Sequence, residues 1–124
     1  MIYTSYFAKI NTLPENVVPI SIAAKAPDRY YGASYKPLAP GYDLLMQYRK
    51  DGDEKRYAKE YYHQIRFLNA TRVVYDLARI AKGKDICLVC YEKPSNFCHR
   101  RIVSEWLNSY GYICKEWDEN EREE

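Results

Sequence analysis

The sequence predicts a single small α/β domain, three-layer-like, with a mostly parallel central sheet and flanking helices. Segments typical of strands alternate with segments typical of helices along the chain. Residues 85–90 form a nearly continuous apolar run after a helical segment, which is typical of a central strand buried on both faces. With 124 residues and a hydrophobic fraction of 47%, the chain can form one core of ordinary domain size.

The first half of the chain contains two predicted strands and a long connection. Residues 2–8 and 17–23 are rich in strand-forming side chains and predict the first two strands. Residues 24–42 contain prolines, glycines and tyrosines, which predict a long irregular loop. Long loops in compact domains are often functional, so this loop is a candidate for ligand contact.

The second half is predicted to be mostly helical around the central strand. A short helix is expected from Asp43, and a strongly periodic one from about Asp53. Thr71 is expected to cap a third helix that ends at Gly83. A fourth helix over residues 97–110 and a last strand over 112–117 complete the predicted order.

The charge of the chain is unevenly distributed. Residues 118–124 contain five acids and one arginine and carry −4, so residues 1–117 carry +6 of the total of +2. We therefore expect one domain over 1–117 and an acidic, flexible tail over 118–124. A basic body is compatible with an anionic ligand or with nucleic acid, although no basic stripe is visible in the sequence to favour the latter.

The chain shows no signal-peptide pattern at its start and no apolar run of membrane-spanning length. We therefore expect a cytoplasmic protein without a membrane partner, with four cysteines as reduced thiols. Cys87 and Cys114 are expected to be buried in strands as small hydrophobic residues.

The candidate site is the segment from Cys90 to Arg100. The strand that ends at Cys90 leads into a seven-residue loop, and the loop leads into a helix that begins near Cys98. Ligands of open α/β sheets bind beyond the carboxyl ends of the strands, which is where this loop is expected to lie. The N–H groups of Phe97, Cys98 and His99 at the helix start would favour an anion.

Helical spacing separates the residues at the start of this helix. His99 falls in the middle of the apolar face and is expected to point inward over the sheet, either as a site residue or as a core histidine bonded to backbone. Arg100 falls on a flank, where its planar fork matches a phosphate or carboxylate, or pairs with a nearby glutamate. Arg101 falls on the opposite side and is expected to be exposed.

The same segment leaves several chemistries open. If the protein is an enzyme, Cys98 or Cys90 is the nucleophile and His99 or Glu92 the acid–base group. A Cys90–Cys98 redox pair is an alternative. A zinc site is disfavoured, because Cys87 and Cys90 lie three apart in one strand and point to opposite faces. No metal or cofactor is expected.

Other residues are candidates for lining the cleft. Ser5 and Tyr6 at the end of the first strand, and Ser21 in the second, would lie there if these strands run parallel to the third. The loop tyrosines Tyr30 and Tyr31, together with Tyr35, could stack on a ligand or pack on the core.

The chain resembles the domain of unknown function 488 family. The resemblance is carried by the segment from Leu88 to Pro94, by Phe97-Cys98-His99-Arg100 and by the amphipathic helix that follows. The opening strand and the segment from Tyr35 to Pro40 are similar to the family's smaller members, which are encoded by bacteria and phages. The resemblance implies an α/β fold and a site at the Cys-His-Arg segment.

This chain departs from the longer family members in the second strand. Many of them have an Asp-x-Arg pair at its end, where this chain has Ser21-Ile22-Ala23. A role of those charged residues therefore cannot be carried over to this chain.

From these observations we expect a protein that binds an anionic, phosphate-bearing small molecule, such as a nucleotide derivative, at the segment from Cys90 to Arg100. A thiol-dependent enzyme that acts on such a ligand is the second reading, and a nucleic-acid-binding protein is the third. The oligomeric state is not predicted by the sequence.

Overall fold

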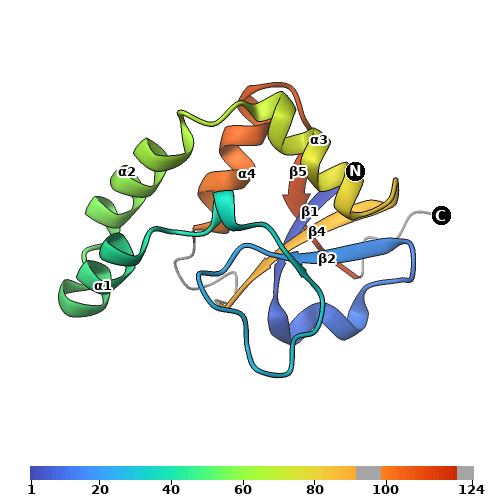
Figure 1. The fold of residues 1–124 in the computed structure, drawn as a ribbon, viewed down its shortest axis with the longest axis horizontal. Coiled ribbons are helices and arrows are strands. Elements are labelled where there is room, and N and C mark those ends of the chain that lie inside the picture. The colour runs from blue at the N-terminus through green and yellow to red at the C-terminus, as the bar shows by residue number, and fades with distance from the viewer. Residues whose placement is uncertain (92–98, 120–124) are drawn as a thin grey trace.

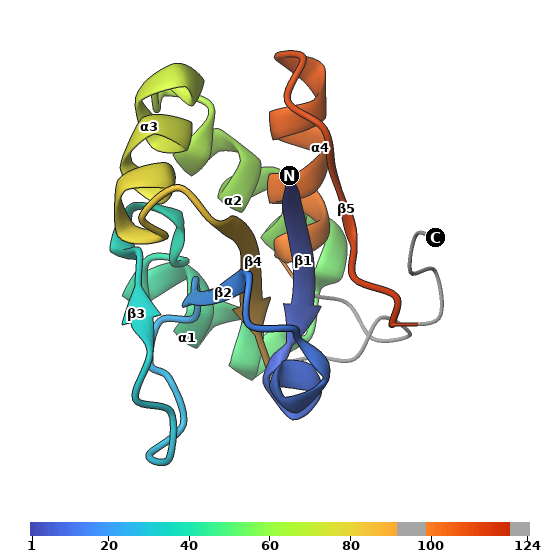
Figure 2. The ribbon, with the colours of Figure 1, turned by 90° about the vertical axis from the view of Figure 1, so that its right-hand side faces the viewer.

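The computed structural model describes residues 1–91 and 99–119, and its centre is a five-stranded sheet in the order β3-β2-β4-β1-β5 (Figures 1 and 2). All four strand pairings are parallel. The predicted α/β class with a parallel sheet is therefore confirmed, and the apolar run 85–90 is the central strand. The strands are β1 (Ile2–Tyr6), β2 (Val17–Ser21), β3 (Ala33–Ser34), β4 (Asp85–Cys90) and β5 (Cys114–Glu116).

In the part of the chain that the structure describes, four α-helices and two short 3-10 helices connect the strands. The first 3-10 helix, η1, follows β1, and the second, η2, lies in the connection after β3. Three α-helices lie between η2 and β4, and the last joins β4 to β5 (Figure 1). The bounds are η1 (Phe7–Thr12), η2 (Lys36–Leu38), α1 (Tyr42–Asp51), α2 (Glu54–Ile65), α3 (Ala70–Ile80) and α4 (Arg100–Ser109).

The register of the strands assigns each side chain to one face of the sheet. Leu88 and Cys90 of β4 belong to the main core cluster, which also contains the buried residues of α2, α3 and α4. Cys87 and Val89 belong to a second cluster, against which side chains of η1 pack. The helices α2–α4 thus cover one face of the sheet, here called the helix face, and η1 covers part of the opposite face.

This division follows from the direction of each crossover. Parallel strands are joined by right-handed connections. The connection from β1 to β2 crosses the sheet in one direction, whereas those from β3 to β4 and from β4 to β5 cross it in the other (Figure 2). Two right-handed connections that cross the sheet in opposite directions must lie on opposite faces of it. The sheet therefore separates η1 from the α-helices.

Several element boundaries differ from the sequence-based expectation. The connection 24–42 is not irregular throughout, because it contains β3 and η2. Residues Phe7 and Ala8 leave the first strand and begin η1. Helix α3 is capped by Asn69, whose side chain accepts a hydrogen bond from the N–H of Arg72, and not by Thr71. The amide oxygen of Asn69 satisfies an N–H that would otherwise lack a partner in the first helical turn.

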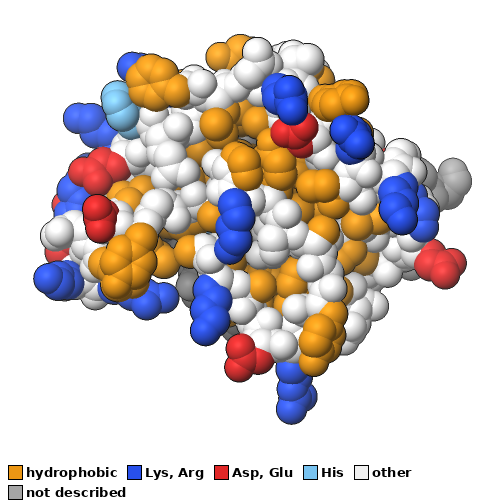
Figure 3. Space-filling model, viewed as in Figure 1, with side chains coloured by type: hydrophobic (Ala, Val, Ile, Leu, Met, Phe, Trp, Pro, Cys, Tyr) orange, Lys and Arg blue, Asp and Glu red, His pale blue; other side chains and the backbone are white. Residues whose placement is uncertain are grey.

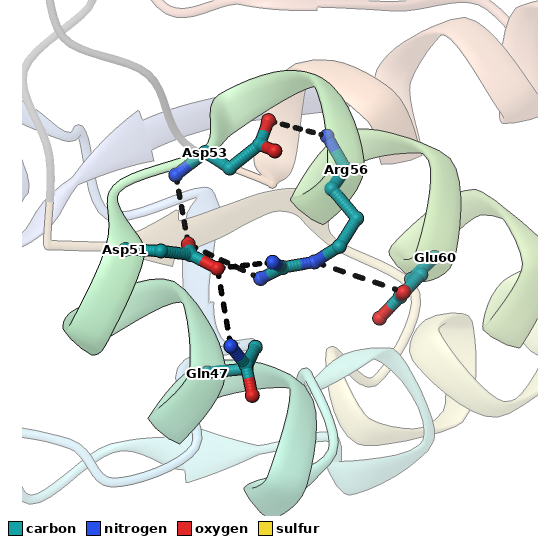
Figure 4. A network of polar contacts seen from close by, with 5 residues as sticks. All are labelled: Gln47, Asp51, Asp53, Arg56 and Glu60. Atoms are coloured by element: carbon teal, nitrogen blue, oxygen red, sulfur yellow. Dashed lines mark hydrogen bonds and ion pairs between the residues drawn. The ribbon is translucent and has the colours of Figure 1, made fainter.

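Helices α1 and α2 form a hairpin with a polar hinge (Figure 4). Gly52 adopts a left-handed conformation with φ +61° between the helices, which an L side chain rarely adopts. Asp53 caps α2 by accepting from the N–H of Arg56. The guanidinium of Arg56 forms ion pairs with Asp51 across the hinge and with Glu60 one turn along α2.

The end of the described chain returns to the sheet. The ring of Trp117 packs edge-on against Tyr3 with centroids 5.0 Å apart. Glu119 forms an exposed ion pair with Lys9 of η1. That residues 118–124 contribute little to folding stays a prediction. None of the helices in residues 1–91 and 99–119 is both long and apolar enough to cross a membrane.

Candidate functional site

The site is centred on the carboxyl ends of β4 and β1. Cys90 ends β4 and is paired in register with Tyr6, which ends β1. Cys90 belongs to the helix-face cluster, and Tyr6 shares its face because registered neighbours in a sheet point the same way. Helix α4 begins above them, so its first residues lie over this edge of the sheet, as the sequence predicts.

Arg100 is the first residue of α4 and is buried, with a residue exposure of 3%. Its Nε and Nη2 donate to Oε1 and Oε2 of Glu116, both at 3.1 Å, and its Nη1 donates to Sγ of Cys90 at 3.1 Å. The guanidinium carbon also lies 5.6 Å from the ring centroid of Tyr6. Arg100 therefore joins β4, β1 and β5, and its charge is balanced by a carboxylate of the protein.

Thr4 extends this network into the sheet. Its hydroxyl donates to Oε1 of Glu116 at 2.8 Å, and its side chain is buried. Glu116 is therefore held from two sides, by Arg100 and by Thr4. This arrangement keeps a charged pair satisfied at the sheet edge, as a buried charge requires.

His99 lies on the other side of the central strand. It is 5% exposed, and its Nε2 lies 2.7 Å from the carbonyl oxygen of Ile22, just beyond β2. Burial lowers the pKa of His99 to about 4. The ring is therefore neutral at pH 7, and its Nε2–H donates to that carbonyl. The inward orientation predicted from the helical spacing is confirmed, and Arg101 is exposed as expected.

Tyr61 of α2 completes the surroundings of His99. The two rings meet edge to face with centroids 5.0 Å apart, and Tyr61 is fully buried. The pKa of Tyr61 is raised by burial, so its hydroxyl stays protonated. His99 thus ties the start of α4 to both β2 and α2.

The described cysteines differ in whether their thiols are free or disulfide-bonded. Cys87 and Cys114 are free and buried, and burial raises the pKa of both thiols, which keeps them protonated and unreactive. Cys87 and Cys90 belong to clusters on opposite faces of the sheet, as the strand spacing predicts. Cys90 is disulfide-bonded, so the expectation that all four cysteines are reduced thiols is wrong for this one.

Ser5 and Ser21 reach the correct edge of the sheet but face away from the site. The strands run parallel, as these assignments required, and both serines are registered with Val89. Val89 belongs to the cluster on the η1 face, whereas Cys90 belongs to the helix face. Both serines are buried, and the hydroxyl of Ser21 accepts from the N–H of Ala23. Alternation of side chains thus separates Ser5 and Ser21 from Arg100.

The loop tyrosines are not gathered at the site. Tyr30 packs on Phe7 and donates to the carbonyl oxygens of Pro19 and Ala33, and burial raises its pKa to about 12. The hydroxyl of Tyr35 donates to Oδ2 of Asp76 on α3 at 2.7 Å.

Tyr31 differs from both of these tyrosines, because it is 90% exposed. Tyr30 and Tyr35 therefore hold the connection 24–42 against the domain, and of the tyrosines assigned to the ligand only Tyr6 borders Arg100.

Three predicted site residues, Glu92, Phe97 and Cys98, lie outside the described residues. Their expected roles stay predictions. The site residues that the sequence reasoning missed are Thr4, Glu116 and Tyr61. Glu116 had a signal, since it is an acid in the last predicted strand, but Arg100 was expected to pair with a glutamate nearer in sequence.

The fold and the site together define a small parallel α/β domain with a buried arginine and a buried histidine at the start of the helix after its central strand. A family model described as the active DUF488-N3 subclade, DUF488-N3a, matches residues 10–111. The chain therefore belongs to the domain of unknown function 488 family. No curated protein and no solved structure matches it.

Proposed function

We propose that this protein binds an anionic, phosphate-bearing small molecule, such as a nucleotide derivative, at the edge formed by Tyr6, Cys90 and Arg100. The observation that supports this is the guanidinium of Arg100, which is buried beyond the carboxyl ends of parallel strands. This is the position at which open α/β sheets bind their ligands. We also propose that the protein is cytoplasmic and that it comes from a bacterium or a phage.

A ligand that binds Arg100 must compete with the carboxylate of Glu116. The side chain of Arg100 is 4% exposed, whereas that of Glu116 is 38% exposed. A ligand therefore approaches from the side of Glu116 and replaces its carboxylate on the guanidinium fork. A phosphate presents two oxygens to Nε and Nη2 in the same way as a carboxylate, so it can replace Glu116 with the same bidentate geometry.

A thiol-dependent enzyme is the second candidate, because Nη1 of Arg100 lies 3.1 Å from Sγ of Cys90. A guanidinium at that distance stabilises a sulfur anion once the disulfide of Cys90 is reduced. The description of the matched subclade as active favours this candidate. His99 is poorly suited as its general base, because a pKa of about 4 lies well below the operating pH.

The proposal is tested by measuring thermal unfolding of the full chain with nucleoside mono-, di- and triphosphates and with inorganic phosphate. We expect at least one of these to raise the midpoint, and Arg100→Lys to reduce the rise because lysine lacks the fork. Nucleosides without phosphate are the matched control. If no phosphate compound raises the midpoint, or if nucleosides do so equally, the proposal is wrong.

A further inference from the structure

Helix α2 has an exposed face opposite to the one that packs on the domain. Its buried residues are Tyr57, Tyr61 and Ile65, so its apolar face is already used by the core. Lys55, Lys59, Tyr62 and Arg66 are all exposed. They are spaced four, three and four apart and, at about 100° per residue, fall within about 60° of arc. These four residues are here called the α2 stripe.

The α2 stripe is visible only once the helix is formed. Its basic residues are separated in the sequence, and the chain as a whole carries only +2. The stripe has a length of about 16 Å at 1.5 Å per residue. The helical spacing therefore brings together basic residues that are not adjacent in the sequence.

The acids near the α2 stripe are turned away from it. Glu60 lies about 140° from Lys55 around the helix and pairs with Arg56 (Figure 4). Arg56 also holds Asp51, on the side of α2 that faces α1. Among the ion pairs of residues 1–91 and 99–119, none involves Lys55, Lys59 or Arg66. Within the described residues, the three positive charges of the stripe therefore have no ion-pair partner.

An aromatic platform continues the stripe beyond the end of α2. The ring of Phe67 is 71% exposed. The guanidinium carbon of Arg66 lies 4.8 Å from its centroid, and the ring of His63 meets it edge-on at 5.3 Å. Tyr62, on the stripe itself, is 47% exposed. An exposed ring held by a cation is the kind of surface on which an unpaired base stacks.

We propose that the α2 stripe and Phe67 bind single-stranded nucleic acid, with Lys55, Lys59 and Arg66 on successive phosphates and a base on Phe67. Figure 3 shows Lys and Arg side chains over the end of the molecule formed by α1 and α2, with Asp, Glu and exposed hydrophobic side chains among them. A membrane surface fits less well. An interfacial helix needs an apolar face for the lipid, and that of α2 is buried against the domain.

This surface is distinct from the candidate site. Tyr61, on the buried face of α2, contacts His99, whereas the stripe points outward from the same helix. The proposal therefore does not rest on the function proposed for Arg100, and either can fail without the other.

The test is fluorescence anisotropy of a labelled, unstructured RNA oligonucleotide such as U20, titrated with the full chain at several KCl concentrations. Three phosphate contacts predict a slope of log affinity against log salt of about −2, which is a loss of about 20-fold between 50 and 200 mM. The triple variant Lys55→Gln, Lys59→Gln, Arg66→Gln is expected to lose this salt-dependent binding. Phe67→Ala is expected to weaken binding about 5-fold or more with the slope unchanged, because stacking is not ionic.

The matched control is the triple variant Lys25→Gln, Arg29→Gln, Lys84→Gln, which removes the same charge from exposed positions outside α2. It is expected to retain affinity within about twofold, and circular dichroism verifies that both triple variants are folded. Equal losses in the two triple variants would show unspecific attraction and overturn the proposal. Absence of RNA binding by the unchanged protein, or binding to 3:1 phosphatidylcholine–phosphatidylserine vesicles in its place, would also overturn it.

Discussion

The guanidinium of Arg100 and the carboxylate of Glu116 meet at two points, with Nε and Nη2 of the arginine each 3.1 Å from a carboxylate oxygen. The pair connects the first turn of α4 to the edge strand β5. The hydroxyl of Thr4 on β1 donates a further hydrogen bond to Glu116. The pair therefore serves the fold, and at the same time holds an anion where the proposed ligand would bind. The two roles can be separated by substitutions at Glu116 and at Arg100.

Glu116→Gln removes the protein's own anion but keeps an oxygen that accepts from Arg100. We expect it to lower the free energy of unfolding by about 1–3 kcal/mol, since hydrogen bonds to charged groups have that value. If a phosphate competes with Glu116, the same substitution should raise the affinity for the phosphate compound that stabilises the unchanged protein. Glu105→Gln, at an exposed position on α4, is the control and should change neither quantity. Both are measured by urea unfolding and by the ligand-induced thermal shift.

Arg100→Ala and Arg101→Ala compare adjacent positions with opposite surroundings. Arg100→Ala should abolish ligand binding and also destabilise the fold by about 3 kcal/mol or more, because it leaves a carboxylate at the sheet edge without its partner. Arg101 is exposed, so its replacement should alter the free energy of unfolding by less than about 0.5 kcal/mol. Urea unfolding measures the free energy of unfolding, and the ligand-induced thermal shift measures ligand binding. Equal effects of the two variants would contradict the placement of Arg100.

The state of the cysteines is tested by counting alkylated thiols with intact-mass spectrometry. In denaturant without a reductant, we expect Cys87 and Cys114 to be modified, because they are free cysteines, and Cys90 to stay unmodified, because it is disulfide-bonded. After reduction we expect all four cysteines of the sequence to be modified. In the folded protein, burial should keep Cys87 and Cys114 unmodified under either condition. Four modified residues in denaturant without reductant would contradict a disulfide at Cys90.

The elements of this fold are predictable from the sequence, because their signals are local. The run 85–90 is too apolar for any place but the middle of a sheet, and the spacing of Tyr57, Tyr61 and Ile65 fits one face of a helix. The order of strands is not local. That β5 lies beside β1, and so brings Glu116 to Arg100, depends on how whole elements pack against one another.

The candidate site was predicted only in part, because some of its features depend on local spacing and others on the packing of distant elements. His99 points inward because helical spacing determines which face it shares, and that spacing is visible in the sequence. The face of Ser5 and Ser21 could not be predicted, because a strand end predicts the edge of the sheet and not the face. The hydrogen bond of Tyr35 could not be predicted, because its partner, Asp76, lies on a helix 41 residues away.

The last prediction concerns pH and the buried His99. Its pKa is about 4 in the folded protein, against an ordinary value near 6.5, because burial disfavours the charged ring. The unfolded chain therefore binds a proton below about pH 6.5, while the folded protein does not until about pH 4. The contribution of neutral His99 to the free energy of unfolding is fully present above pH 6.5. The free energy of unfolding should fall by about 3 kcal/mol as the pH drops to 4.

Two carboxylates titrate at lower pH and can be distinguished from His99. Hydrogen bonds from Arg56 lower the pKa of Asp51, and those from Tyr35 and then Arg72 lower the pKa of Asp76. Their contributions are present above their ordinary pKa of 3.8 and are lost only below it. The interval from pH 6.5 to about 4.5 therefore reports mainly on His99.

The measurement is urea unfolding at pH 7.5, 6.5, 5.5 and 4.5 for three proteins. The unchanged protein should lose stability steadily below pH 6.5. His99→Gln keeps an N–H that can donate to the carbonyl of Ile22, but it cannot take up a proton, so its stability should vary little over this interval. His63→Gln, at an exposed position on α2, should behave like the unchanged protein. A pH dependence that survives in His99→Gln and disappears in His63→Gln would show that His99 is not the buried neutral group.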